Sequence, residues 1–147
     1  MFVIPIQLNK FDPQFATGFA AKEYIGAVLF LLASAINVWA GYTMSQLGKG
    51  TPLPLDCPNQ LVVQGPYRYV RNPMAIGGIS QGIAVGIILG SGLVVIYALS
   101  GAFIWHIFVR PHEELDLLDR FGNEYKVYRQ TVRNWLPHLK PYIKNSY

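Results

Sequence analysis

The sequence is short of charge. Only 14% of its 147 residues are charged and 52% are apolar, whereas soluble domains carry about 25% charged residues. The charges are also unevenly placed, because none occurs in Tyr24–Gly48 or in Asn72–Val109. Charge-free stretches of this length exclude an ordinary soluble domain and predict an all-α integral membrane protein.

Cysteine and linker sequence are scarce as well. A single cysteine, Cys57, excludes an internal disulfide, so the fold does not depend on an oxidising compartment. No stretch has the composition of a linker, and a chain of about 150 residues favours one domain. We therefore expect residues 1–147 to form a single membrane-embedded domain without a metal ion. We expect no cleavable signal, since the first apolar run, Phe2–Leu8, contains Pro5 and lacks a basic start.

Three apolar segments predict membrane spans. Residues 24–44 are long enough to cross a bilayer at about 1.5 Å per residue. Residues 74–90 and 93–109 are shorter and are separated by Ser91-Gly92, which predicts a helical hairpin over 74–109. The hairpin would return the polar sequences before and after it to one side of the membrane.

Glycines support the hairpin. In a soluble helix each would cost about 1 kcal/mol, whereas in a membrane a glycine face lets a neighbouring backbone approach closely. The first hairpin segment carries four glycines at four-residue spacing: Gly78, Gly82, Gly86 and Gly90.

The sequences that flank the spans are polar or broken. Residues 113–133 repeat apolar side chains at three- and four-residue steps, which predicts an amphipathic helix that lies on the membrane or packs over the hairpin. Gly122 is expected to interrupt that helix, and Tyr125 and Tyr128 to seat it. Met1–Ala21 is predicted to be interfacial or re-entrant, because none of its apolar runs reaches about 20 residues.

Basic residues predict the orientation. Residues 45–73 contain Lys49, Arg68 and Arg71, and seven more lysines and arginines follow from Arg110 onward. Positive charge favours the cytoplasmic side, so we expect residues 45–73 and 110–147 to face the cytoplasm, from the plasma or inner membrane in a prokaryote. The basic residues flank apolar runs instead of forming one face, which favours anionic membrane lipids over nucleic acid as partners.

One ordered set of motifs stands out between Leu61 and Pro137. It begins with GPYRYVRNPMAIGG at Gly65–Gly78 and continues with RPHEExxL from Arg110. It ends with FGxxYxxYxxxVxxxxP from Phe121. This order resembles the isoprenylcysteine carboxyl methyltransferase family, whose tail is related to that of phospholipid N-methyltransferases.

The resemblance implies S-adenosylmethionine as the cofactor, held at the cytoplasmic membrane face. It also implies that an arginine before the acidic pair binds the acceptor's carboxylate, and Arg110 is the nearest candidate, one residue closer to Glu113 than in the family. We assign Arg110 as the catalytic residue. The residues assigned to the cofactor are Leu61, Val62, Tyr67, Arg71, Asn72, Pro73, Met74, Ala75, Gly77, Glu113 and Glu114.

The chemistry of the cofactor agrees with this assignment. Glu113 and Glu114 suit its ammonium or ribose hydroxyls through charge-assisted hydrogen bonds. A helix that starts at Asn72-Pro73 offers unpaired amide donors and a dipole to its carboxylate. The residues expected to form the walls around adenine or ribose are Leu61, Val62, Tyr67 and Met74.

The expected acceptor is a lipid-like or prenylated carboxylate that enters laterally between helices. A carboxylate is already a nucleophile at neutral pH, so catalysis would consist of positioning and desolvation. Arg110 would orient it bidentately. The family often has His in place of Asn72 and an aromatic residue in place of Ala75, and Ala75 would leave a wider pocket.

Other interpretations stay open. The alternative acceptor is a phospholipid or amine nitrogen. Sterol reductases resemble the tail distantly but would need a larger basic surface. In a non-enzymatic membrane subunit, Arg68 and Tyr69 would be interfacial anchors, and a Glu113-Glu114 pair opening a helix would compensate its dipole. His106 is either a hydrogen-bonded core residue or a group near the cofactor's sulfonium.

Overall fold

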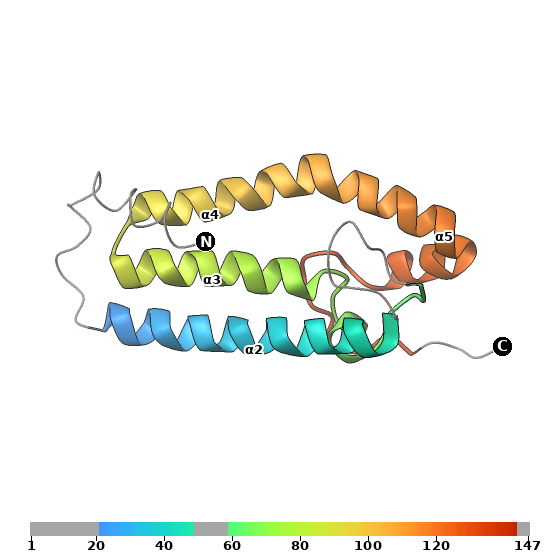
Figure 1. Cartoon of the computed structure of the whole chain (residues 1–147), viewed down its shortest axis with the longest axis horizontal. Helices are drawn as coiled ribbons and strands as arrows, with labels where there is room; N and C mark the ends of the chain where they lie inside the picture. Colours follow the sequence, from blue (N-terminus) through green and yellow to red (C-terminus); the bar gives the residue numbers. More distant parts are fainter. Residues whose placement is uncertain (1–20, 49–58, 144–147) are drawn as a thin grey trace.

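The computed structural model describes residues 21–48 and 59–143. The described chain is all-helical, as predicted (Figure 1). The predicted interfacial segment Met1–Ala21, apart from its last residue, and Cys57 lie outside the described residues. The helices are α2 (Lys22–Gly48), α3 (Pro73–Leu89), α4 (Gly92–Ile104) and α5 (Arg110–Thr131).

Two helices are long and apolar enough to cross a membrane. One is α2, with 27 residues, and the other runs through α4 and α5 from Gly92 to Thr131, with 40 residues. The shorter apolar helix α3 has 17 residues. Only 17% and 6% of the most apolar windows of the two long helices are buried by the described chain. Such uncovered apolar surface fits a lipid environment, because water would disfavour it.

The predicted hairpin is present. Helix α3 begins with Asn72 as its N-cap and Pro73 at its first position, where a missing amide proton costs nothing. It ends at Gly90, whose φ of 65° is left-handed, and the Ser91 side chain then caps α4 by accepting from Val94 N. Figure 1 shows α3 between α2 and α4, with neighbouring helices running in opposite directions.

The glycine face has two functions. A Cβ at Gly82 would lie 2.8 Å from Ala98 Cβ, and one at Gly86 would lie 2.6 Å from Val95 Cγ2. These two glycines therefore let α4 approach α3 closely. A Cβ at Gly78 would meet nothing within 4 Å, so this glycine leaves space open instead.

The helix that follows the hairpin turn differs from the expectation. No break in the helix separates the apolar run that ends at Val109 from the amphipathic sequence that follows it. The helix continues through a π-helical turn, Trp105–Val109, directly into α5 (Figure 1). Glu113 and Glu114 thus lie inside a continuous helix, so they do not open one and do not compensate a dipole at its start.

Gly122 interrupts α5, as predicted. Its φ of 50° and ψ of −122° are not helical, and the chain folds back there toward the end of α2 (Figure 1). The returning part packs Tyr125, Tyr128 and Val132 against Val63 in one buried cluster. The Tyr128 hydroxyl donates to Tyr67 O over 2.6 Å. Both tyrosines therefore seat the helix, and they do so on the loop that precedes α3.

Candidate active site

A network of arginines and carboxylates joins α5 to the loop before α3. Glu114 Oε1 lies 2.7 Å from Arg71 Nη1 and 3.1 Å from Arg110 Nη2. Glu114 Oε2 lies 3.1 Å from Arg129 Nε. Glu114 is therefore the centre of the network and holds three cations together.

All three side-chain nitrogens of Arg110 have partners within the protein. Its side chain is 6% exposed, and its Nη1 contacts Glu113 Oε2 at 3.4 Å. Its Nη2 donates to the Tyr125 hydroxyl over 3.3 Å, and its Nε donates to Glu114 Oε1 over 3.1 Å. The contact with Glu113 is the longest of these ion-pair contacts and is the easiest to exchange.

The two glutamates have opposite electrostatic environments, and both lie beyond the apolar run that ends at Val109. Burial raises the pKa of Glu113 above its ordinary value, because the charge and hydrogen bond of Arg110 only partly offset the desolvation. Burial acts on Glu114 in the same direction, but Arg110, Arg71 and Arg129 outweigh it and lower its pKa. Glu114 therefore stabilises the network as a charged group. Glu113 has a weaker contact and is better suited to bind a further cation.

A small chamber lies beside this network. Its volume is about 50 Å³, and five residues assigned from the sequence share it. One of them, Arg71, has a side chain 10% exposed, and its Nε is buried with no hydrogen-bond partner among the described residues. An unpaired buried donor is costly, so this atom is suited to an incoming anion. The chamber is lined by Met44, Leu61, Val62, Tyr67, Arg71, Arg110, Leu117, Tyr125 and Tyr128.

A larger pocket adjoins the chamber through Leu61 and Val62, which line both. Its volume is about 490 Å³, and its lining combines apolar side chains, amides and one carboxylate. Sequence reasoning assigned only Leu61 and Val62 in this region. It missed Phe121 and Glu124, because they lie on α5 about sixty residues further along. The lining is Leu47, Asn59, Gln60, Leu61, Val62, Val63, Gln64, Phe121 and Glu124.

Three more of the assigned residues lie at the start of α3: Asn72, Pro73 and Met74. The Asn72 side chain does not cap the helix; its Nδ2 donates to Asn134 Oδ1 over 3.1 Å, a partner that the sequence did not reveal. Pro73 is buried at the first helical position. Met74 packs against the buried cluster that contains Val62 and Tyr67. The first turn of α3 is therefore held between the loop and the chain that follows α5.

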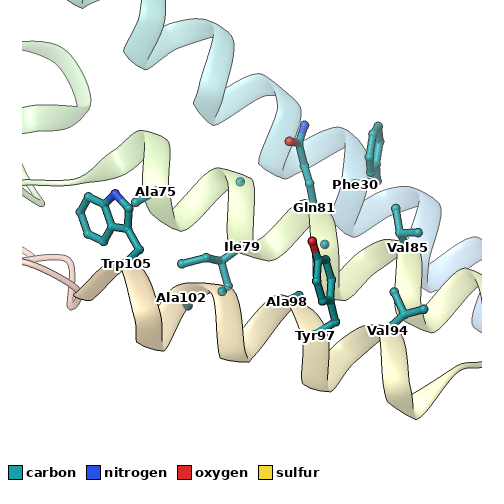
Figure 2. Close-up of a pocket in the computed structure, with 13 residues that line it drawn as sticks. Phe30, Ala75, Ile79, Gln81, Val85, Val94, Tyr97, Ala98, Ala102 and Trp105 are labelled. Atoms are coloured by element: carbon teal, nitrogen blue, oxygen red, sulfur yellow. The ribbon is translucent and has the colours of Figure 1, made fainter. Parts of the chain in front are cut away.

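Ala75 and Gly77 lie apart from the chamber. A Cβ at Gly77 would collide with the Asn37 side chain of α2, so the structure places Gly77 in a helix–helix contact. Asn37 Nδ2 in turn donates to Gln81 Oε1 over 3.2 Å, which ties α2 to α3. Ala75 faces the opposite neighbour, α4, near Trp105 (Figure 2).

Ala75 belongs to an apolar groove between α3 and α4. The groove has a volume of about 550 Å³ and runs from Ala75 and Trp105 at one end to Val85 and Val94 at the other (Figure 2). Small residues create it, because a Cβ at Gly78 would have no neighbour within 4 Å. The lining is Phe30, Ala75, Gly78, Ile79, Gln81, Gly82, Val85, Val94, Tyr97, Ala98, Gly101, Ala102 and Trp105.

His106 is hydrogen-bonded to the chain that follows α5. The Trp135 indole Nε1 lies 3.2 Å from His106 Nδ1, and the indole ring also contacts Trp105 edge to face at 5.7 Å. An indole nitrogen can only donate, so His106 Nδ1 accepts and the ring proton lies on Nε2. The hydrogen bond of the first interpretation is therefore present, but the core position that it expected is wrong, because the ring is exposed.

Comparison with known proteins agrees with the motif order. The model of the phospholipid methyltransferase family matches residues 21–124. Two curated proteins, each named probable protein-S-isoprenylcysteine O-methyltransferase, are 27% identical over 125 residues; they come from Oryza sativa subsp. indica and subsp. japonica. The match covers 80% of this chain but only 62% of each relative.

Proposed function

Since the chain belongs to the phospholipid methyltransferase family, we propose that it transfers a methyl group from S-adenosylmethionine to a lipophilic carboxylate at the cytoplasmic membrane face. One observation carries this proposal. Five residues assigned from the sequence line one chamber, and among them Arg71 keeps a buried, unpaired Nε. A scaffold protein would gain nothing from leaving such a donor unsatisfied.

The residues fit the cofactor, which supplies an activated methyl group when bound. Arg71 Nε is suited to its carboxylate, and Glu113, 28% exposed and with one long contact, is suited to its ammonium. The larger pocket has the mixed lining that adenosine requires. Phe121 offers an aromatic wall, and the amides of Gln60 and Gln64 offer hydrogen bonds.

An exchange of partners links the two ligands. If Glu113 turns to a bound ammonium, its 3.4 Å contact with Arg110 Nη1 is lost. Arg110 then has an unpaired donor at the network, which an acceptor carboxylate satisfies. The catalytic role assigned to Arg110 thus depends on cofactor binding first, and the reaction should follow an ordered mechanism.

The electrostatics favour a carboxylate over an amine as the acceptor. The network holds Arg71, Arg110 and Arg129 against Glu113 and Glu114, an excess of one positive charge, which repels a cationic amine. An amine also needs a general base to lose its proton. Burial raises the pKa values of two chamber phenols, so they are poor bases; these are Tyr67 and Tyr128.

The groove between α3 and α4 provides for the acceptor's chain. It is nearly all apolar, which suits a lipid-like chain. Its Ala75–Trp105 end follows directly on the turn that carries Arg71 and Asn72. A chain in this groove would bring its polar end toward the arginine network, and Ala75 in place of a larger side chain widens the entrance.

Calorimetric titration with S-adenosylhomocysteine tests the cofactor site. The detergent-purified protein should bind it saturably, Glu113→Ala should lose binding, and Asp119→Ala, an exposed α5 carboxylate, should retain it. Methyl transfer to N-acetyl-S-farnesylcysteine is then compared with transfer to phosphatidylethanolamine vesicles. Transfer to the amine alone would refute the carboxylate acceptor, and absence of S-adenosylhomocysteine binding would favour a reductase relative or a non-enzymatic subunit.

A further inference from the structure

The chain that follows α5 is strongly basic. From Val132 to Tyr147 the sequence contains three lysines and arginines and no aspartate or glutamate. Two of the three, Arg133 and Lys140, are exposed. The described part of this region, residues 132–143, is here called the C-terminal tail. Its charge suits an anionic partner.

The C-terminal tail also exposes large apolar side chains. Leu136 is 62% exposed, Leu139 is 99% exposed and Ile143 is 68% exposed. Pro137 and Pro141 lie between them and prevent a helix that would turn some of them inward. Basic and apolar side chains interleaved on one exposed segment have the composition of a membrane-interface anchor.

Backbone hydrogen bonds hold the tail in this exposed position. His138 N donates to Tyr69 O over 2.8 Å, and Tyr142 N donates to Arg68 O over 2.9 Å. Arg71 N donates to Arg133 O over 3.0 Å. The tail therefore follows the loop before α3, and its leucines stay exposed although its backbone is fixed to that loop.

The start of the tail lies at the level where the apolar helix ends. Trp135 contacts Trp105 and His106 in the π-helical turn, five and four residues before the charged part of α5 begins at Arg110. Tryptophan prefers the headgroup region of a bilayer. The tail is thus continuous with the surface that the apolar helices present to lipid.

We propose that the C-terminal tail is an interfacial anchor that inserts Leu136, Leu139 and Ile143 into the acyl–headgroup boundary of an anionic leaflet. Arg133 and Lys140 contact the anionic headgroups. Because the tail is hydrogen-bonded to residues 68–71, its anchorage holds Arg71 at a fixed depth beside the membrane. This inference does not depend on the reaction that the site performs.

Fluorescence quenching tests the anchor in the full chain. The lone cysteine is replaced (Cys57→Ser), and a bimane label is attached at Leu139→Cys in vesicles of phosphatidylcholine and phosphatidylglycerol. Two single-cysteine controls bracket the result: Asp119→Cys, exposed on α5, and Leu99→Cys, 50% exposed on α4. We expect brominated lipid to quench label 139 nearly as strongly as label 99. We expect iodide to quench it several-fold less than label 119.

The alternatives give different results. Iodide access at position 139 equal to that at 119 overturns the proposal, because the tail would then lie in water. Protection from both quenchers also overturns it, since protein and not lipid would cover the tail. In the variant labelled at position 139, Arg133→Gln and Lys140→Gln should each lower the ratio of membrane-inserted to water-exposed tail about fivefold in anionic vesicles. They should leave S-adenosylhomocysteine affinity unchanged, and an unchanged ratio would refute the assigned headgroup contacts.

Discussion

Glu114 and Glu113 are neighbours in sequence, but their replacement should have different consequences. Glu114 is 15% exposed and pairs with Arg71 and Arg110, whose side chains are 10% and 6% exposed. Glu114→Gln keeps the shape but leaves two buried guanidinium groups without their shared anion. Removing one partner of a buried ion pair costs about 3–5 kcal/mol. This cost arises from Arg71 and Arg110. The ion pair with Arg129, whose side chain is 47% exposed, contributes little to stability.

Glu113→Gln should be nearly neutral for folding. Glu113 is 28% exposed and forms an ion pair with Arg110 at 3.4 Å within the same helix. A helical pair of this kind contributes about 0.2–0.5 kcal/mol. Since burial already raises the pKa of Glu113, the neutral amide also relieves a desolvation cost. The expected loss is therefore below about 1 kcal/mol.

Thermal unfolding in detergent measures the difference. At about 2–4 °C per kcal/mol for a chain of this size, Glu114→Gln should lower the Tm by roughly 6–20 °C. Glu113→Gln should change it by less than about 4 °C and yet abolish S-adenosylhomocysteine binding. Equal Tm losses in the two variants would refute the distinction between a structural and a ligand-binding carboxylate. Unchanged binding in Glu113→Gln would refute the ammonium assignment.

Three further outcomes follow from the structure. Gly122→Ala should destabilise the fold by about 1–3 kcal/mol in thermal unfolding, because φ 50° and ψ −122° suit only glycine; no loss would mean that α5 does not fold back there. Gly78→Leu should raise the acceptor KM about tenfold or more by filling the groove, whereas Gly41→Leu, equally free of neighbours but outside the groove, should not; equal effects would exclude the groove as the acceptor site. The affinity for S-adenosylhomocysteine should fall as pH drops through the raised pKa of Glu113, because the protonated acid cannot pair with an ammonium. Stability supplied by Glu114, whose folded-state pKa is lowered, is present above its ordinary value of 4.5 and should be lost as pH falls through the folded-state pKa; a Tm that stays constant in acid would contradict this.

Much of the architecture was predictable from the sequence. Uninterrupted apolar runs identified the helices, because a chain in lipid must satisfy its backbone within each helix. Pro73 and Gly90 marked the ends of α3, and Gly122 marked the break in α5, since each has a backbone preference that acts locally. Motif order indicated the family and brought Arg71 and Glu114 under consideration together.

Only the tertiary structure decided which of these residues share an environment. It separates Glu114, at the centre of three arginines, from Glu113, and it places Gly77 against the Asn37 side chain of α2. It also pairs Asn72 with Asn134, 62 residues further along. The reason is physical: apolar runs and helix ends are written in consecutive residues, whereas burial and ion pairing arise where the fold brings distant residues together.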